Sequence, residues 1–211
     1  LDCPYEAIAM FTRLDGREEM VARVDPALCV SCGICSGSCA PMRVGPAART
    51  GRDQLVQIKS FTEAEAPTAD TIVLVACRRG AGGITERAVL DGAKVYPVEC
   101  AGNLHTSSIE YLVRAGVQGV MIVSCPPRDC WTREGVIWME QRLFHEREAE
   151  LQSRVDRRRI RVVHAASGEL AEVRLALASF RAELRAIGQT EAEQDLSVQR
   201  ACDTELTTSG T

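Results

Sequence analysis

The stretch GVMIVSC, residues 119–125, is a short run of apolar and β-branched residues that ends in a cysteine. Two earlier runs have the same form, TIVLVAC at 71–77 and AKVYPVEC at 93–100. A fourth, IRVVHAAS at 160–167, has the composition without the terminal cysteine. Continuous apolar strands that alternate with helical sequence predict a parallel sheet covered on both faces. We therefore expect residues 71–188 to form a Rossmann-like α/β domain, a small parallel sheet with flanking helices.

Three helices can be placed around these strands. The segment 103–116 has cap residues at both ends and predicts a helix that starts at 106–107. The charged segment 131–158, which carries scattered apolar residues, is interpreted as a second and longer helix. Apolar residues repeat at three and four positions over 170–187, which predicts a third helix that ends before Gly188.

The cysteines that close the three runs are candidates for one shared site. Cys77, Cys100 and Cys125 each end a strand, and Cys130 follows the last of them across PPRD. Because the carboxyl ends of parallel strands meet at one edge of the sheet, we expect these cysteines to gather around one point. Four thiolates there suit a tetrahedral metal or a small iron–sulfur cluster. Spacing alone does not separate zinc from 2Fe-2S.

Two other interpretations of these cysteines stand beside a metal site. A cysteine within a strand is often only a small buried hydrophobic residue. A nucleophilic cysteine at a strand-to-helix turn is the other, since SCPPRDC at 124–130 is similar to a phosphatase loop. The arginine that such a loop requires would fall at Trp131, which counts against the nucleophile.

A different cysteine pattern opens the chain. In CVSCGICSGSCAP, residues 29–41, three cysteines are evenly spaced and the fourth, Cys39, is out of step. In the bacterial ferredoxin pattern three such thiolates hold one 4Fe-4S cluster, while the fourth cysteine binds a different cluster. Cys3 precedes Pro4, as expected of the last cysteine of a preceding run, and supplies the missing ligand. The sequence therefore predicts one 4Fe-4S cluster on Cys3, Cys29, Cys32 and Cys35.

Cys39 is predicted to bind a second 4Fe-4S cluster whose other ligands lie upstream of Leu1. We expect that upstream run to be missing through processing, truncation or an incomplete gene model. Residues 7–24 are two apolar segments around LDGR, an Asp-Gly hairpin signal. Such a hairpin is expected between the two cysteine runs of a ferredoxin.

Four parts of the chain are expected from these patterns. Residues 1–45 are predicted to form a partial bacterial-ferredoxin-like α+β module that is incomplete at its N-terminus. Residues 46–70 are rich in Pro, Gly and Arg and lack a persistent period, which predicts a linker. The α/β domain follows at 71–188, and the polar segment 189–211 is predicted to be a disordered tail.

Composition and charge narrow the classes of function. The net charge of −4 argues against nucleic-acid binding. No apolar run reaches the roughly 20 residues that span a bilayer, and no signal-peptide pattern is present, so we expect a cytoplasmic protein that does not insert into membranes. In that compartment 10 cysteines indicate metal or redox chemistry. Without a glycine fingerprint for a dinucleotide, neither flavin nor NAD is expected in this chain.

The α/β part has a first-strand cysteine followed by GAGG, and the motifs YPVECAGN, AGVQGVMIVSC, CPPRDC and REGVIWMEQRL. By these motifs residues 72–188 resemble the delta subunit of methyl-viologen-reducing hydrogenase, an iron–sulfur electron-transfer family found with heterodisulfide reductase. It implies a 2Fe-2S cluster on Cys77, Cys100, Cys125 and Cys130. The N-terminal part is similar to the ferredoxin tail of the flavoprotein component of heterodisulfide reductase.

If both cysteine sets hold iron–sulfur clusters, the chain carries electrons and has no candidate site for the conversion of a substrate. We therefore expect a non-catalytic electron-transfer subunit of an oxidoreductase complex. The resemblance implies that it relays single electrons between a hydrogenase- or formate-dehydrogenase-like enzyme and a heterodisulfide-reductase-like flavoprotein. The alternative is a zinc-stabilised interaction scaffold that carries one ferredoxin cluster.

Overall fold

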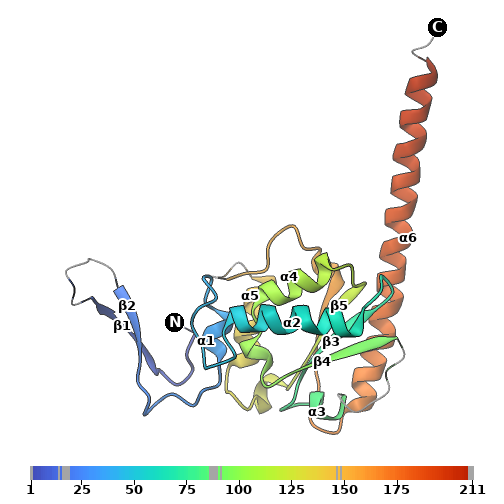
Figure 1. Cartoon of the computed structure of the whole chain (residues 1–211). Helices are drawn as coiled ribbons and strands as arrows, with labels where there is room; N and C mark the ends of the chain where they lie inside the picture. Colours follow the sequence, from blue (N-terminus) through green and yellow to red (C-terminus); the bar gives the residue numbers. More distant parts are fainter. Residues whose placement is uncertain are drawn as a thin grey trace.

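The protein combines a parallel sheet, an antiparallel hairpin on one side of it and a long helix on the other (Figure 1). The computed structural model describes residues 2–13, 15, 20–85, 90, 92–145, 147 and 149–208, without the side chains of residues 84 and 191–208. The hairpin projects from the body at one end, and the C-terminal helix extends well beyond it at the other.

The parallel sheet contains the four strands that the sequence predicts. They are β3 (Ile72–Cys77), β4 (Ala93–Val98), β5 (Gly119–Ser124) and β6 (Ile160–His164). Their spatial order is β4-β3-β5-β6, and all neighbours pair in parallel. The α/β fold class is therefore confirmed. Pro97 fits this sheet because β4 lies at its edge, where a missing amide hydrogen leaves no ladder bond unmade.

Both faces of the sheet are covered, which explains why its central strands are apolar throughout. Val73 and Val75 of β3 pack into one core with α4 (Thr106–Arg114) and α5 (Gly135–Phe144). The residues of β3 that alternate with these two, Ile72, Leu74 and Ala76, pack into a second core on the other face of the sheet. Every residue of β3 and β5 is buried.

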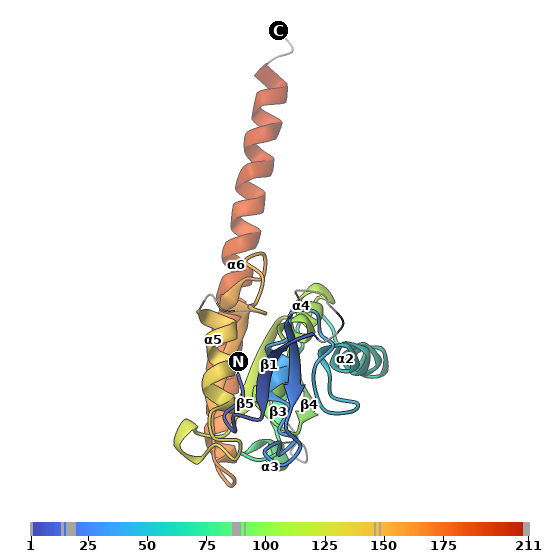
Figure 2. The same ribbon diagram turned by 90° about the vertical axis from the view of Figure 1, so that its left-hand side faces the viewer.

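The second core is closed by α6 (Leu170–Thr208). The predicted apolar stripe of this helix is buried against the sheet through Val173, Leu177, Phe180 and Leu184. Figure 2 shows the sheet between this helix and α2 (Gly51–Glu65). The short helix α3 (Gly82–Thr85) lies beside the end of β3.

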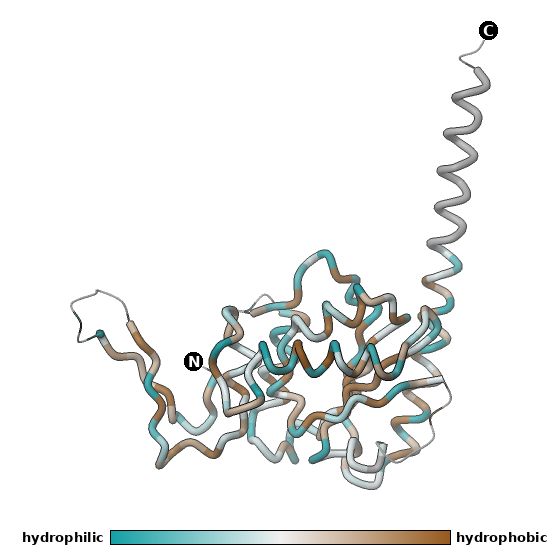
Figure 3. The backbone as a smooth tube through the Cα atoms, viewed as in Figure 1, coloured by the Kyte–Doolittle hydropathy of each residue, from teal (hydrophilic) through white to brown (hydrophobic). Residues whose placement is uncertain are grey.

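The predicted hairpin is formed by β1 (Ile8–Thr12) and β2 (Met20–Val24), which pair in an antiparallel register. Every residue of β2 is exposed, and hydrophobic segments run along both strands (Figure 3). The expected LDGR turn lies largely outside the described residues. A short helix, α1 (Ile34–Gly37), follows within the cysteine loop. The ferredoxin-like module as a whole stays a prediction.

Residues 46–70 differ from the expected irregular linker, because most of them form α2. This helix begins with a capping box: Thr50 Oγ1 accepts a hydrogen bond from the Asp53 amide, and the Asp53 carboxylate accepts one from the Thr50 amide. Apart from Gly51, its buried residues are only Gln54 and Ile58. With so few buried positions, the apolar residues of this segment do not repeat at helical spacing clearly enough for the sequence to predict α2.

The expected long helix over 131–158 is wrong. Helix α5 ends at Phe144, and the described residues between it and the turn η3 (Arg157–Arg159) are not helical. The loop is fixed by buried Leu151 and by Arg157, whose guanidinium donates to the carbonyls of Leu143 and Leu151 at 3.0 and 2.9 Å. The apolar residues in this segment thus pack from a loop.

The expected end of the last helix at Gly188 is also wrong, because α6 continues to Thr208. The predicted disorder over 189–211 is contradicted as far as that residue, and the last three residues lie outside the described part. Of the helices described, α6 included, none combines the length and the apolar content needed to cross a membrane.

We predict that Gly102→Ala destabilises the fold by about 1–3 kcal/mol through overpacking. A Cβ at Gly102 would lie 2.5 Å from the Cα of Gly135, so that the start of α5 would have to move. Urea unfolding measures the change. Gly188→Ala is the matched control, since a Cβ there meets nothing within 4 Å and should stabilise the helix by about 0.5–1 kcal/mol. Equal effects of the two substitutions would contradict this packing.

Candidate functional site

The cysteines of the α/β domain come together at the carboxyl edge of the sheet. Cys77 is the last residue of the central strand β3, and Cys100 and Cys125 follow the strands on its two sides. The Cys77 thiol contacts those of Cys100 and Cys125, and the Cys125 thiol also contacts Cys130. The structure therefore brings all four of these predicted residues into one chain of contacting thiols, which we call the sheet-edge group.

Thr132 is a fifth member of this neighbourhood that the sequence did not indicate. Its Oγ1 lies 3.1 Å from the Cys100 sulfur and 3.5 Å from the Cys130 sulfur. Gly135 leaves the room for this contact, because a Cβ there would lie 2.5 Å from the Thr132 oxygen and 3.3 Å from the Cys100 sulfur. The hydroxyl thus links the two ends of the thiol chain.

Backbone amides are directed at the sulfurs as well. Cys77 accepts hydrogen bonds from the amides of Ala101 and Arg79, and Cys100 accepts one from Gly102. Cys130 accepts from the amides of Val136 and Thr132. Amide donors favour the thiolate over the thiol, and hydrogen bonds to sulfur are one means by which proteins set the potential of iron–sulfur clusters.

The thiol contacts divide the negative charge unevenly. Hydrogen bonds from Cys100 and Cys125 lower the pKa of Cys77 to about 2, and a hydrogen bond from Cys125 lowers the pKa of Cys130 to about 5. The pKa values of Cys100 and Cys125 are raised, because each donates its proton to a neighbouring sulfur and is also desolvated. The negative charge of the group is therefore favoured at Cys77 and Cys130 over Cys100 and Cys125.

The glycines that follow β3 allow the loop to cross this edge. A Cβ at Gly82 would lie 2.1 Å from the Cys77 carbonyl oxygen, and one at Gly80 would lie 3.0 Å from the Cys125 backbone. The loop is held by the Ala81 amide, which donates to the Ala165 carbonyl at 2.9 Å. The GAGG sequence is thus required by the close approach of the loop to two of the cysteines.

The cysteines predicted to hold the 4Fe-4S cluster line a separate cavity of about 130 Å³. They are Cys3, Cys29, Cys32 and Cys35, which we call the N-terminal group. Burial raises the pKa of Cys35 to about 11, and the charges of the other three sulfurs add to the shift. The Ala7 amide donates to the Cys3 sulfur at 3.4 Å. The structure therefore places these residues around one space.

Cys39 does not line that cavity. It lies along a larger groove of about 760 Å³, together with Ile8 and Ala22 of the hairpin and with Arg147. Its carbonyl oxygen accepts hydrogen bonds from the Met42 amide at 2.7 Å and from His105 Nε2 at 3.3 Å. The out-of-step cysteine thus lies in a different space from Cys3, Cys29 and Cys32, and Cys35 lines both spaces.

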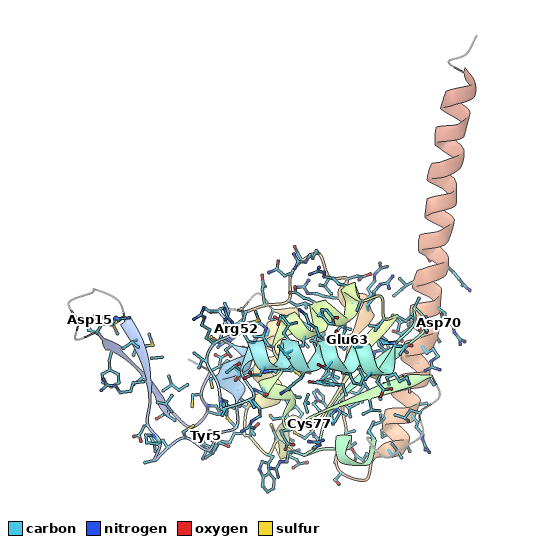
Figure 4. All side chains as sticks on the ribbon, viewed as in Figure 1. Tyr5, Asp15, Arg52, Glu63, Asp70 and Cys77 are labelled. Carbon is cyan, nitrogen blue, oxygen red and sulfur yellow. The ribbon has the colours of Figure 1, made fainter. Side chains whose placement is uncertain are left out.

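The two cysteine groups open into one groove of about 270 Å³, which we call the shared groove. It is lined by Tyr5, Val30, Ser31, Cys32, Arg49, Arg79, Glu99, Cys100, Trp131 and Thr132. Burial raises the pKa of Tyr5, and the charges of Cys32, Cys130 and Cys100 add to the shift. Arg133 lies over the Tyr5 ring at 4.6 Å. In Figure 4 Tyr5 lies at the base of the hairpin and Cys77 in the body of the protein, both toward the lower side.

Buried polar contacts join the N-terminal group to the turn that follows Cys100. Asn103 Nδ2 donates to the Gly33 carbonyl at 2.7 Å, and the His105 ring contacts the Cys39 carbonyl. Arg142, whose side chain is fully buried, donates to the Gly102 carbonyl at 2.8 Å and to Ser38 Oγ at 3.1 Å. These three residues were not indicated as interface residues by the sequence, and His105 also caps α4.

The cysteines are suitable ligands for a metal centre, but their side chains are not arranged around a metal position in this structure. In the described part of the chain, no three or more His, Cys, Asp or Glu side chains are arranged as a ready metal site. The sheet-edge thiols contact one another instead of surrounding a common point. Four cysteines with amide donors nevertheless match the donor set of an iron–sulfur cluster. Loading such a site has to remove the remaining protons and move the sulfurs apart.

A family model agrees with the resemblance of the sequence. The model described as "Methyl-viologen-reducing hydrogenase, delta subunit" matches residues 72–188, more than half of the chain. This range contains the whole parallel sheet and the sheet-edge group, and the N-terminal group lies outside it. No curated protein matches the chain.

We predict that Asn103→Ala loosens the cysteine loop from the α/β domain. The substitution removes the buried donor to the Gly33 carbonyl and a second bond to the Arg49 carbonyl, which should cost about 1–3 kcal/mol. Hydrogen exchange should rise over residues 29–50 and stay unchanged in β3 and β5.

Gln57→Ala is the matched control for this prediction. Its amide also donates to a backbone carbonyl, that of Ala48 at 3.0 Å, but the bond is exposed to solvent. We expect almost no change in exchange or stability. If both variants exchange alike, the buried contact does not hold the loop.

Proposed function

Because the chain belongs to the family of methyl-viologen-reducing hydrogenase delta subunits, we propose that it relays single electrons through cysteine-held iron–sulfur clusters in an oxidoreductase complex. The observation that carries this proposal is the convergence of Cys77, Cys100, Cys125 and Cys130 at one sheet edge. Packing of the sheet explains why strands β3, β4 and β5 end at one edge, but it does not explain why each of them is followed or ended by a cysteine.

The proposal assigns each cysteine group its own role. The sheet-edge group would hold a 2Fe-2S cluster, and the N-terminal group would hold a 4Fe-4S cluster. Cys39 would contribute to a second 4Fe-4S cluster with ligands from outside the described chain. Iron–sulfur clusters supply reversible one-electron chemistry, and their potentials depend on hydrogen bonding and exposure.

The protein's own residues would stabilise charge and exclude water. The amides of Ala101, Arg79 and Gly102 donate to sulfur and so favour thiolates in a buried setting. Cys77, Cys100 and Cys125 are each at most 5% exposed, which limits the access of water to that edge. The shared groove brings Cys32 and Cys100 to a common surface. This geometry favours passing electrons between two stations.

The partners follow from the family and from the sequence resemblance. A delta subunit works with other subunits of a complex. We propose that a hydrogenase- or formate-dehydrogenase-like enzyme lies at one end of the relay, and a heterodisulfide-reductase-like flavoprotein at the other. The flavin would belong to that partner.

We predict that Cys125→Ser removes the cluster of the sheet-edge group. The protein is reconstituted with iron and sulfide without oxygen, and iron, sulfide and zinc are counted. We expect about two fewer iron atoms per chain than in the unchanged protein, with loss of the 2Fe-2S signal in low-temperature EPR of the reduced sample. The 4Fe-4S signal should stay.

Cys202→Ser is the control, because the tenth cysteine belongs to neither group. Its iron content and both signals should match those of the unchanged protein. A Cys125→Ser variant that keeps all of its iron would refute the assignment. Zinc in place of iron at the sheet edge would instead identify a zinc-stabilised interaction scaffold that carries one ferredoxin cluster.

A further inference from the structure

The shared groove exposes apolar surface next to both cysteine groups. Trp131, which follows Cys130 directly, is 69% exposed, and Val30, beside Cys29, is 55% exposed. Large exposed aromatic residues are uncommon on surfaces without a partner and are enriched where proteins bind one another. These two residues therefore mark a contact surface at the opening of the two groups.

Trp131 is held in place although it is exposed. The guanidinium of Arg79 lies over its ring at 4.9 Å, which is within the range of a cation–π contact. A side chain that is already ordered loses less conformational freedom when a partner covers it. The tryptophan is thus prepared to serve as an anchor for docking.

The charge of the groove selects the kind of partner. Its charged lining residues are Arg49, Arg79 and Glu99, and Glu99 forms an ion pair with Arg78 at 2.6 Å. Among the described residues, neither Arg49 nor Arg79 pairs with a carboxylate; Arg49 donates to the Ser31 carbonyl at 2.9 Å. The positive charge that stays uncompensated in the groove complements an acidic surface.

We propose that the shared groove is the docking site for the acidic face of a small redox protein, with Trp131 as its anchor. This inference rests on the proposed function, since it places the exchange of electrons where both cysteine groups reach the surface. The clusters that the two cysteine groups would hold would each accept one electron from the reduced partner. No bond forms or breaks, and no proton or other reactant is needed.

The test uses the full reconstituted chain and a bacterial ferredoxin, a small acidic iron–sulfur protein, as the probe. Binding of the oxidised proteins is measured by calorimetry at low and at physiological salt. Trp131→Ala should weaken binding about tenfold or more. The double variant Arg49→Glu with Arg79→Glu should weaken it by a similar factor at low salt and lose most of the salt dependence.

Two substitutions on α6 serve as matched controls. Leu175 is as exposed as Trp131, at 69%, but belongs to α6, which contributes no residue to the lining of the groove, and Arg174 is an exposed arginine next to it. Leu175→Ala and Arg174→Glu should bind ferredoxin like the unchanged protein. Equal losses in these controls, or no binding of ferredoxin at low salt, would overturn the proposal.

A small reductant separates this inference from the function on which it rests. A reduced viologen dye needs no docking surface, so Trp131→Ala, which alters no residue that donates to a sulfur, should accept its electrons at the unchanged rate. If the unchanged protein takes no electrons from the dye, the proposed function fails. If it does so and the charge-reversed variant still binds ferredoxin normally, only the docking site fails. That double variant retains Trp131 and every cysteine, so it decides the question even where Trp131→Ala does not fold.

Discussion

The parallel pairing of β3 with a strand on each side is the constraint on which the cysteine sites depend. The register sets Cys77 opposite Val98 and Ala76 opposite Val123, so that all three strands end at the same level. The residues that follow then emerge at one edge. An antiparallel neighbour would run the other way and carry its cysteine to the far edge of the sheet. The sheet-edge group is therefore a consequence of strand direction and register, and both are fixed by burial of apolar side chains on two faces.

The turn after Cys100 fixes the position of the N-terminal group relative to the sheet. The carbonyl of Gly102, the side-chain amide of Asn103 and the ring of His105 all contact residues that pack against or lie within the N-terminal cysteine loop. These polar groups are buried, and removing the partner of any one of them should lower the free energy of unfolding by about 1–3 kcal/mol. Apolar contacts alone would allow the N-terminal loop to shift relative to the turn after Cys100. Directional hydrogen bonds fix one relative position of the two groups.

The sequence predicted the features that repeat and missed those that do not. Three strand-ending cysteines form a pattern, and strand composition alone was enough to place them. Asn103 contacts Gly33 across 70 residues of sequence, and no local pattern records such a contact. Gly188 was wrongly predicted to end the last helix, because a glycine ends a helix only where the backbone turns into the left-handed region. Gly116 ends α4 with a φ of 91°, in the left-handed region, whereas Gly188 is not among the glycines of positive φ, and α6 continues through it.

Arg142 makes the two groups electrostatically dependent on each other. Burial lowers the pKa of this guanidinium to about 10, and the charges of Asp2 and Cys100 oppose the shift, so the side chain is still a cation at neutral pH. It touches the carbonyl of the turn next to Cys100 and the Ser38 hydroxyl of the cysteine loop. A charge added at either group is felt by the same buried cation, in surroundings where water screens little. If the two groups hold clusters as proposed, an electron gained at one would change the potential at the other, because both act on this shared cation.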